Sequence, residues 1–128
     1  MANILGVDFG TRRIGLAWLQ EVLGVVLPFG VIEEGSREKN IEKLVTVVKE
    51  ERVDKMIVGL PYGADGEETP NTKRVRTFVD DVQKQISINV EFEGEEYSTH
   101  EAEAMGGDAS LDEKSAMLIL EAYLGRQK

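Results

Sequence analysis

The chain has 128 residues, the size of one domain with one hydrophobic core, which leaves no room for a second catalytic domain. It contains no cysteine, so a disulfide framework, a thiolate zinc site and a cysteine nucleophile are excluded. The formal net charge is -9, and residues 91–128 carry most of it because they hold ten acidic and three basic residues. Such a charge opposes nucleic-acid binding by the chain as a whole, but the first ninety residues contribute only -2.

No window has the apolar length of a membrane-spanning segment, and the N-terminus lacks a basic stretch followed by a long apolar one. We therefore expect a soluble, cytoplasmic protein that consists of a single domain, residues 1–128, and is a monomer or a weak homodimer.

Three strands are predicted at the start of the chain. Residues Ile4–Val7 read as a buried strand, Ile14–Leu19 as its hairpin partner, and Gly24–Ile32 as a third strand. Because short turns join them, these strands should be antiparallel. Ser36 can then cap a helix that ends near Arg52, with apolar residues at the spacing of one helical face.

Two further strands and three helices follow. Val53–Leu60 is apolar throughout, as expected of a central strand parallel to the first, and an amphipathic helix separates it from a fifth strand at Ile88–Phe92. Ser98 and Ser110 each precede a glutamate by three residues, which predicts two short terminal helices. The order predicts an α/β fold with a mixed five-stranded sheet, three antiparallel strands then two parallel ones, flanked by helices. This is the layout of an RNase H-like domain.

Three acidic residues are expected to meet at one edge of this sheet. Asp8 lies at the end of the first strand, Glu95 just beyond the fifth, and Asp112 on the sheet-facing side of the last helix. Ligands gather outside the carboxyl ends of parallel strands. Three carboxylates repel one another without a cation, and their hard oxygen ligands suit Mg²⁺ or Mn²⁺. Two such ions about 4 Å apart can activate water for in-line attack on a phosphodiester.

Basic and hydroxyl side chains near this edge are candidates for binding substrate phosphate. They are Thr11, Arg12, Arg13, Lys73 and Arg74. Thr11 follows Gly10 in the turn after the first strand, where a hydroxyl or a backbone N–H can donate to a phosphate. The alternative interpretation of the basic groups is solvated surface charge.

Three blocks of sequence carry a resemblance to a known family. They are GVDFGTRRIGLA at 6–17, VGLPY at 58–62 with Asp65-Gly66, and DEKSA at 112–116 leading into ILEAYL at 119–124. In these blocks the chain resembles the YqgF family, bacterial RNase H-like proteins described as pre-16S rRNA nucleases and, earlier, as Holliday junction resolvases. The resemblance implies a metal-dependent nuclease with catalytic and metal-binding residues Asp8, Glu95 and Asp112.

One block departs from the family pattern. The family usually has Asp-Glu-Arg before two threonines, whereas this chain has Gly94, Glu95 and Glu96. An acid in place of the arginine should weaken the attraction for phosphate. It also leaves both Glu95 and Glu96 as candidate ligands, and the register favours Glu95.

The preferred function is hydrolysis of phosphodiester bonds in structured RNA, by resemblance at the 5′ end of precursor 16S rRNA, with ribosomal precursor particles as a possible partner. A Holliday junction resolvase acting on branched DNA is the nearest alternative, because the same chemistry cleaves either polymer. Two hypotheses of other classes are a nucleotide-binding module, suggested by the Asp-x-Gly-Thr turn at 8–11, and a non-catalytic RNA-binding ribosome-assembly factor, suggested by the acidic charge.

Overall fold

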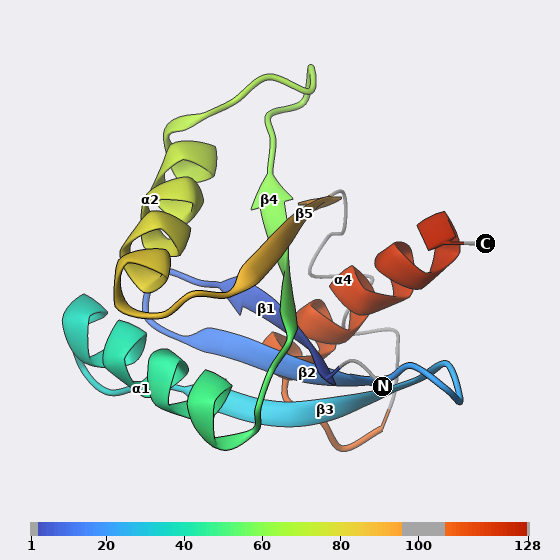
Figure 1. Ribbon diagram of the computed structural model, residues 1–128. Helices are drawn as coiled ribbons and strands as arrows, with labels where there is room; N and C mark the ends of the chain where they lie inside the picture. Colours follow the sequence, from blue (N-terminus) through green and yellow to red (C-terminus); the bar gives the residue numbers. More distant parts are fainter. Residues whose placement is uncertain (1–2, 96–106, 128) are drawn as a thin grey trace.

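A computed structural model describes residues 3–95 and 107–127 of the chain, and its centre is one five-stranded sheet (Figure 1). The strands are β1 (Asn3–Phe9), β2 (Ile14–Gln20), β3 (Val25–Ile32), β4 (Lys55–Pro61) and β5 (Asn89–Glu95). Their order in the sheet is β3-β2-β1-β4-β5. The β1–β2 and β2–β3 pairs are antiparallel and the β1–β4 and β4–β5 pairs are parallel. This confirms the predicted fold class and the position of β4 between β1 and β5.

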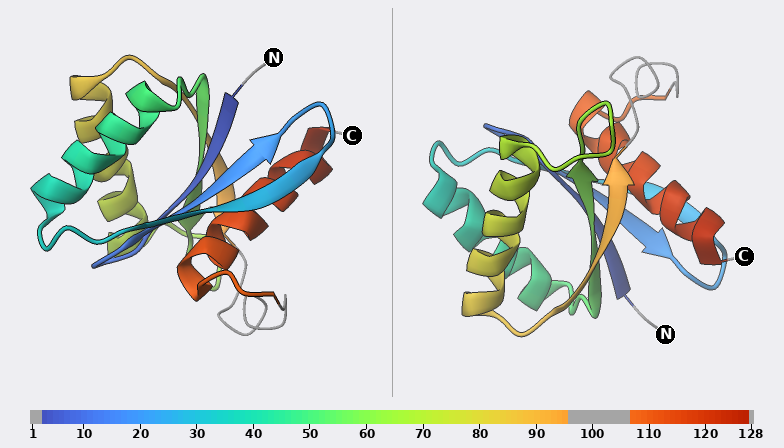
Figure 2. Two further views of the ribbon diagram at one scale, coloured as in Figure 1. Left: turned by 90° about the horizontal axis from the view of Figure 1, so that it is seen from below. Right: turned by 90° about the horizontal axis from the view of Figure 1, so that it is seen from above.

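Helices cover both faces of the sheet. Helices α1 (Arg37–Glu50) and α2 (Pro70–Gln85) lie on one face, and α4 (Leu111–Gln127) crosses the other (Figure 2). Ser36 caps α1 as predicted, because its side chain accepts from the Lys39 N–H at 3.2 Å. No helix in the described part of the chain has the length and apolar character needed to cross a lipid bilayer.

The sheet separates two hydrophobic clusters, and the large apolar residues of β1 are divided between them. Leu5, Val7 and Phe9 belong to the cluster under α1 and α2, whereas Ile4 belongs to the cluster under α4. Successive side chains of a strand point to opposite faces. Asp8, which follows Val7, therefore lies on the α4 face.

Three predicted boundaries need correction. The last helix was expected to be short, but α4 has 17 residues, because its apolar face continues past Tyr123 along the sheet. Glu95 was placed just beyond the fifth strand, yet it is the last residue of β5, paired with Pro61, because the ladder with β4 continues past Phe92. The first strand was predicted as Ile4–Val7, but β1 extends over Asn3–Phe9, and Asp8 lies near its end as expected. The helix predicted after Ser98 lies outside the described residues.

Candidate active site

Asp8 and Asp112 are brought to the same place by a glycine. Asp8 is paired with Gly15 of β2 in the antiparallel register, so both positions face α4. A Cβ atom at Gly15 would lie 2.1 Å from the carbonyl oxygen and 3.1 Å from the Cβ of Asp112. Only a residue without a side chain lets the first turn of α4 approach β2 this closely. Two of the three predicted acids are therefore neighbours on one face of the sheet.

The first turn of α4 is fixed by its own cap. The Ser110 hydroxyl accepts from the Glu113 N–H at 3.2 Å, and the Glu113 carboxylate accepts from the Ser110 N–H at 3.0 Å. This reciprocal pair is the capping box that the sequence predicted. It sets the start of the helix, and hence the height of Asp112 above β2.

Arg13 reaches across from the β1–β2 turn to Asp112. Its Nε atom lies 2.9 Å from Asp112 Oδ2, and the two side chains are 51% and 25% exposed. An exposed pair of this kind is worth little in stability, about 0–1 kcal/mol. Its larger consequence is electrostatic, because the guanidinium competes with any divalent cation for the same carboxylate.

Glu95 is placed by its backbone alone. It ends β5, opposite Pro61 and two residues beyond Glu93. Val7 of β1, Val58 of β4 and Phe92 of β5 lie in one row across the sheet. Asp8 is one residue past this row on β1, and Glu95 is three residues past it on β5. The part of the chain described here contains no group of three acidic or histidine side chains that could hold a metal ion. Glu95 as the third ligand, and its choice over Glu96, therefore stay predictions.

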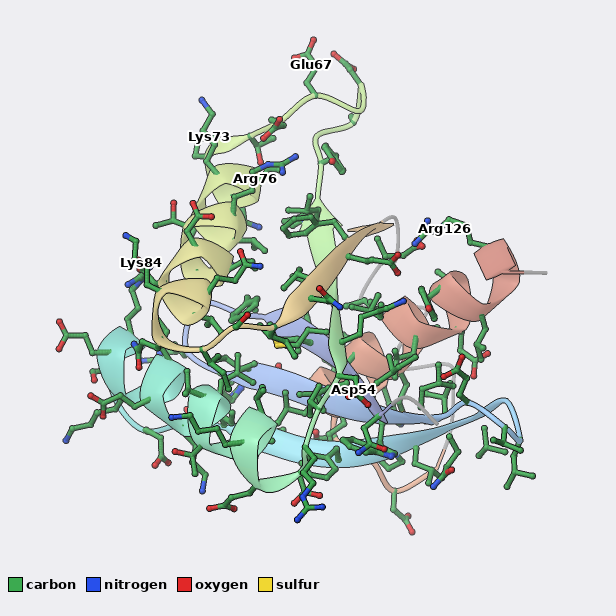
Figure 3. All side chains as sticks on the ribbon, in the orientation of Figure 1. Asp54, Glu67, Lys73, Arg76, Lys84 and Arg126 are labelled. Carbon is green, nitrogen blue, oxygen red and sulfur yellow. The ribbon has the colours of Figure 1, made fainter. Side chains whose placement is uncertain are left out.

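Sequence reasoning missed a buried carboxylate on β5. Glu93 is 7% exposed, and both of its oxygens accept from Nε of Arg126 in α4, at 2.8 and 3.1 Å. The signal was available as the alternation of Glu91, Glu93 and Glu95 with apolar residues along β5. This pair ties the C-terminal part of α4 to the edge of the sheet (Figure 3).

The predicted phosphate-binding residues fall into two groups. Thr11, Arg12 and Arg13 are exposed in the turn between β1 and β2, and Lys73 is exposed in the first turns of α2 (Figure 3). A pocket of about 430 Å³ opens beside Thr11 and Arg12, next to the start of α1. A phosphate role for these residues stays a prediction.

Arg74 was also predicted to bind phosphate, but its guanidinium is directed at the backbone of the β1–β2 turn. It donates from Nη2 to the Phe9 carbonyl at 2.7 Å and from Nη1 to the Gly10 carbonyl at 3.3 Å. Its Nε atom donates to Asn71 Oδ1 at 2.8 Å. The phosphate role of Arg74 is untested by these contacts, which show a different use of the same side chain.

Asn40, which sequence reasoning missed, holds the other side of this turn. It is 6% exposed in α1, donates from Nδ2 to the Arg12 carbonyl at 3.1 Å, and accepts at Oδ1 from the Glu34 N–H at 2.7 Å. An asparagine on the buried face of an amphipathic helix was the available signal, because buried polar groups need partners.

Solved structures with a similar fold identify the class to which this architecture belongs. Thermus thermophilus RuvC in complex with a Holliday junction substrate superposes with a TM-score of 0.62 at 12% identity, covering 99% of this chain and 96% of RuvC. The fowlpox virus resolvase, solved with Holliday junction DNA, gives 0.62 at 10% identity, covering 98% of each chain. The fold is thus that of the RNase H-like resolvases.

The family follows from the sequence comparisons. The model of the RuvX family, described as Holliday junction resolvase, matches residues 2–126. A relative from Maridesulfovibrio salexigens is 30% identical over 97% of this chain and 98% of its own length, and one from Escherichia coli strain SE11 is 36% identical over 94% of each. Both are named "Putative pre-16S rRNA nuclease". The chain belongs to the RuvX/YqgF family, which confirms the resemblance stated from its motifs.

Proposed function

We propose that this protein is a divalent-metal-dependent endonuclease that hydrolyses phosphodiester bonds in structured RNA, with precursor 16S rRNA as its substrate. The observation that carries the proposal is the contact between Gly15 and Asp112, which sets the second acid beside Asp8 in a chain of this family. The names of the relatives point to the polymer, and the two carboxylates point to the reaction.

The donor set fits Mg²⁺ or Mn²⁺. Asp8 and Asp112 offer hard carboxylate oxygens, and neither lies in the apolar interior, since both are partly exposed. Asp8, Asp112 and Glu95 would hold the metal. When bound, divalent ions lower the pKa of a coordinated water and neutralise charge on the phosphate.

The other residues of the site have roles that need only their own chemistry. Thr11, Arg12 and Arg13 stand in an exposed turn directly after the strand that carries Asp8, where they can donate to phosphate oxygens of the substrate. Lys73 adds a positive charge from α2. These cations offset the acidic charge of the chain near Asp8, where the nucleic acid must bind. We place the protein, and the RNA that it cleaves, in the cytoplasm.

The test is cleavage of a precursor 16S rRNA fragment in Mg²⁺. The wild-type protein should cleave it, and Asp8→Asn and Asp112→Asn should each lose at least 100-fold in rate, because each substitution removes a charged ligand. The matched control is Asp54→Asn, an exposed acid at the opposite end of β1 that accepts from the Asn3 N–H. Full activity in Asp8→Asn would refute the proposal.

A Holliday junction resolvase is the second candidate, favoured by the printed description of the family. Offering a four-way DNA junction and the RNA fragment at equal concentrations separates the two, since the better substrate is cleaved first. Symmetrical cutting of a junction calls for two active sites, so this candidate also predicts a dimer in light scattering. A monomer that cleaves the RNA and leaves the four-way junction intact would exclude it.

A further inference from the structure

The segment of residues 9–13, which comprises the last residue of β1 and the β1–β2 turn, is held by side chains from two helices that are distant in the sequence. Arg74 of α2 donates to the carbonyl oxygens of Phe9 and Gly10, and Asn40 of α1 donates to that of Arg12. Three carbonyl groups of this five-residue segment are therefore fixed from outside it. The segment begins directly after Asp8 and ends at Arg13, so its conformation influences where the side chains of Asp8 and Arg13 lie relative to Asp112.

We propose that Arg74 and Asn40 are positioning residues, which clamp this turn and so hold the Asp8 carboxylate in the geometry that binds the metal. The inference rests on the proposed function, because it assumes that Asp8 is a metal ligand. It assigns to Arg74 a structural task in the site, in place of the direct phosphate contact that its charge alone suggests.

The surroundings of both side chains suit a clamp. Arg74 is half-buried, and its guanidinium lies 5.4 Å from the centroid of the Phe78 ring, which in turn stacks on Phe9 at 5.0 Å. Asn40 is almost fully buried and satisfies both ends of its amide. Side chains locked in this way transmit a fixed geometry, as positioning groups around metal ligands must.

The effect of Arg74 on cation binding distinguishes a positioning role from a purely electrostatic one. Removing a positive charge close to a cation site should tighten cation binding, or leave it unchanged, if charge were all that mattered. Loss of a clamp should weaken cation binding instead, because Asp8 would then sample positions that do not bind. Arg74→Gln therefore separates the two roles by the sign of its effect, and the uncharged Asn40 should act in the same direction.

The experiment measures Mn²⁺ affinity by calorimetry on the full chain, without nucleic acid. Arg74→Gln and Asn40→Ala should each weaken Mn²⁺ binding about 10-fold, the size expected for an outer partner of a metal ligand. Arg76→Gln is the matched control, because it removes the same charge from the same helix. Arg76 pairs with Glu68 instead of the β1–β2 turn, so this substitution should leave the Mn²⁺ affinity within twofold of wild type. Arg74→Lys keeps the charge without the rigid fork and should also weaken binding.

Thermal melts followed by circular dichroism show whether each variant is folded at the temperature of the titration. If Asn40→Ala does not fold, the Mn²⁺ affinity of Arg74→Lys decides the test. Unchanged or tighter Mn²⁺ binding by the Arg74 variants would overturn the clamp. If those variants instead lose only RNA affinity, Arg74 is a phosphate ligand and the inference is wrong. A wild-type protein that binds no Mn²⁺ would overturn the proposed function itself, which is a different result.

Discussion

Gly15→Ala is the substitution for which the structure gives the firmest magnitude. The added Cβ would meet the Asp112 carbonyl oxygen at 2.1 Å, and because an ordinary contact needs 3.4 Å, the first turn of α4 must retreat by about 1.3 Å. The obstacle is backbone, which cannot rotate away as a side chain would. Overpacking of this kind costs about 1–3 kcal/mol. The lower backbone entropy of unfolded alanine returns roughly 0.5–1 kcal/mol.

Gly15→Ala should affect the cleavage rate more than the free energy of unfolding. A displacement of about 1 Å in a catalytic group can cost on the order of 100-fold in rate, so we expect Gly15→Ala to fold, melt earlier, and cleave RNA about 100-fold more slowly. Gly6→Ala is the control. Its Cβ would meet the Leu120 Cγ at 2.6 Å and the Ala116 carbonyl oxygen at 3.0 Å, so it also strains the packing of α4, but one to two turns away from Asp112 and without the 2.1 Å backbone clash.

Urea unfolding and single-turnover cleavage, measured on both variants, test this reasoning. Gly6→Ala should lose stability with much less effect on the rate, since the end of α4 that carries Asp112 stays in place. Wild-type stability and wild-type rate in Gly15→Ala would refute the reasoning, because α4 would then have no need to approach β2 so closely.

Three further predictions concern charge. Arg13→Gln should tighten Mn²⁺ binding about threefold in calorimetry, because it removes the guanidinium that pairs with Asp112; an unchanged Mn²⁺ affinity would contradict this. If Arg13 also donates to phosphate, as we propose, the same substitution should weaken RNA binding in a filter assay. The Arg37 guanidinium holds the pKa of Asp81 below its ordinary value of 3.8, so the stability that Asp81 contributes is present above pH 3.8 and lost as the pH falls further. Asp81→Asn should therefore be less stable than wild type at pH 7, and the gap should close in urea titrations below pH 3.8; a gap independent of pH would count against the pair. Glu96→Arg should raise RNA affinity and steepen its dependence on salt, by restoring the cation usual in the family, and equal salt slopes would disprove that.

The hydrophobic pattern was sufficient to predict the architecture. The apolar stretches of the first three strands, the apolar run that ends at Pro61 and the helical spacing around Ile41 and Val75 each reflect local burial, so each could be read without coordinates. Boundaries were less accessible, because pairing across strands decides them. The polar ladder of β5 continues to Glu95 only because β4 lies beside it.

The acidic residues of the candidate site could be predicted from the sequence, but the residues that position them could not. Asp8 and Asp112 could be chosen from strand ends and helix faces, but the role of Gly15 depends on how closely α4 approaches β2. Arg74 and Asn40 act through hydrogen bonds that span 64, 65 and 28 positions, and no sequence spacing encodes contacts of that kind.

The most direct test of the central claim is a crystal structure of the protein soaked in Mn²⁺, with data collected at the manganese absorption edge. The account predicts an anomalous peak in contact with the carboxylates of both Asp8 and Asp112, with the Arg13 guanidinium withdrawn from Asp112. A fully occupied crystal in which manganese binds elsewhere, while Arg13 keeps its pair with Asp112, would contradict it.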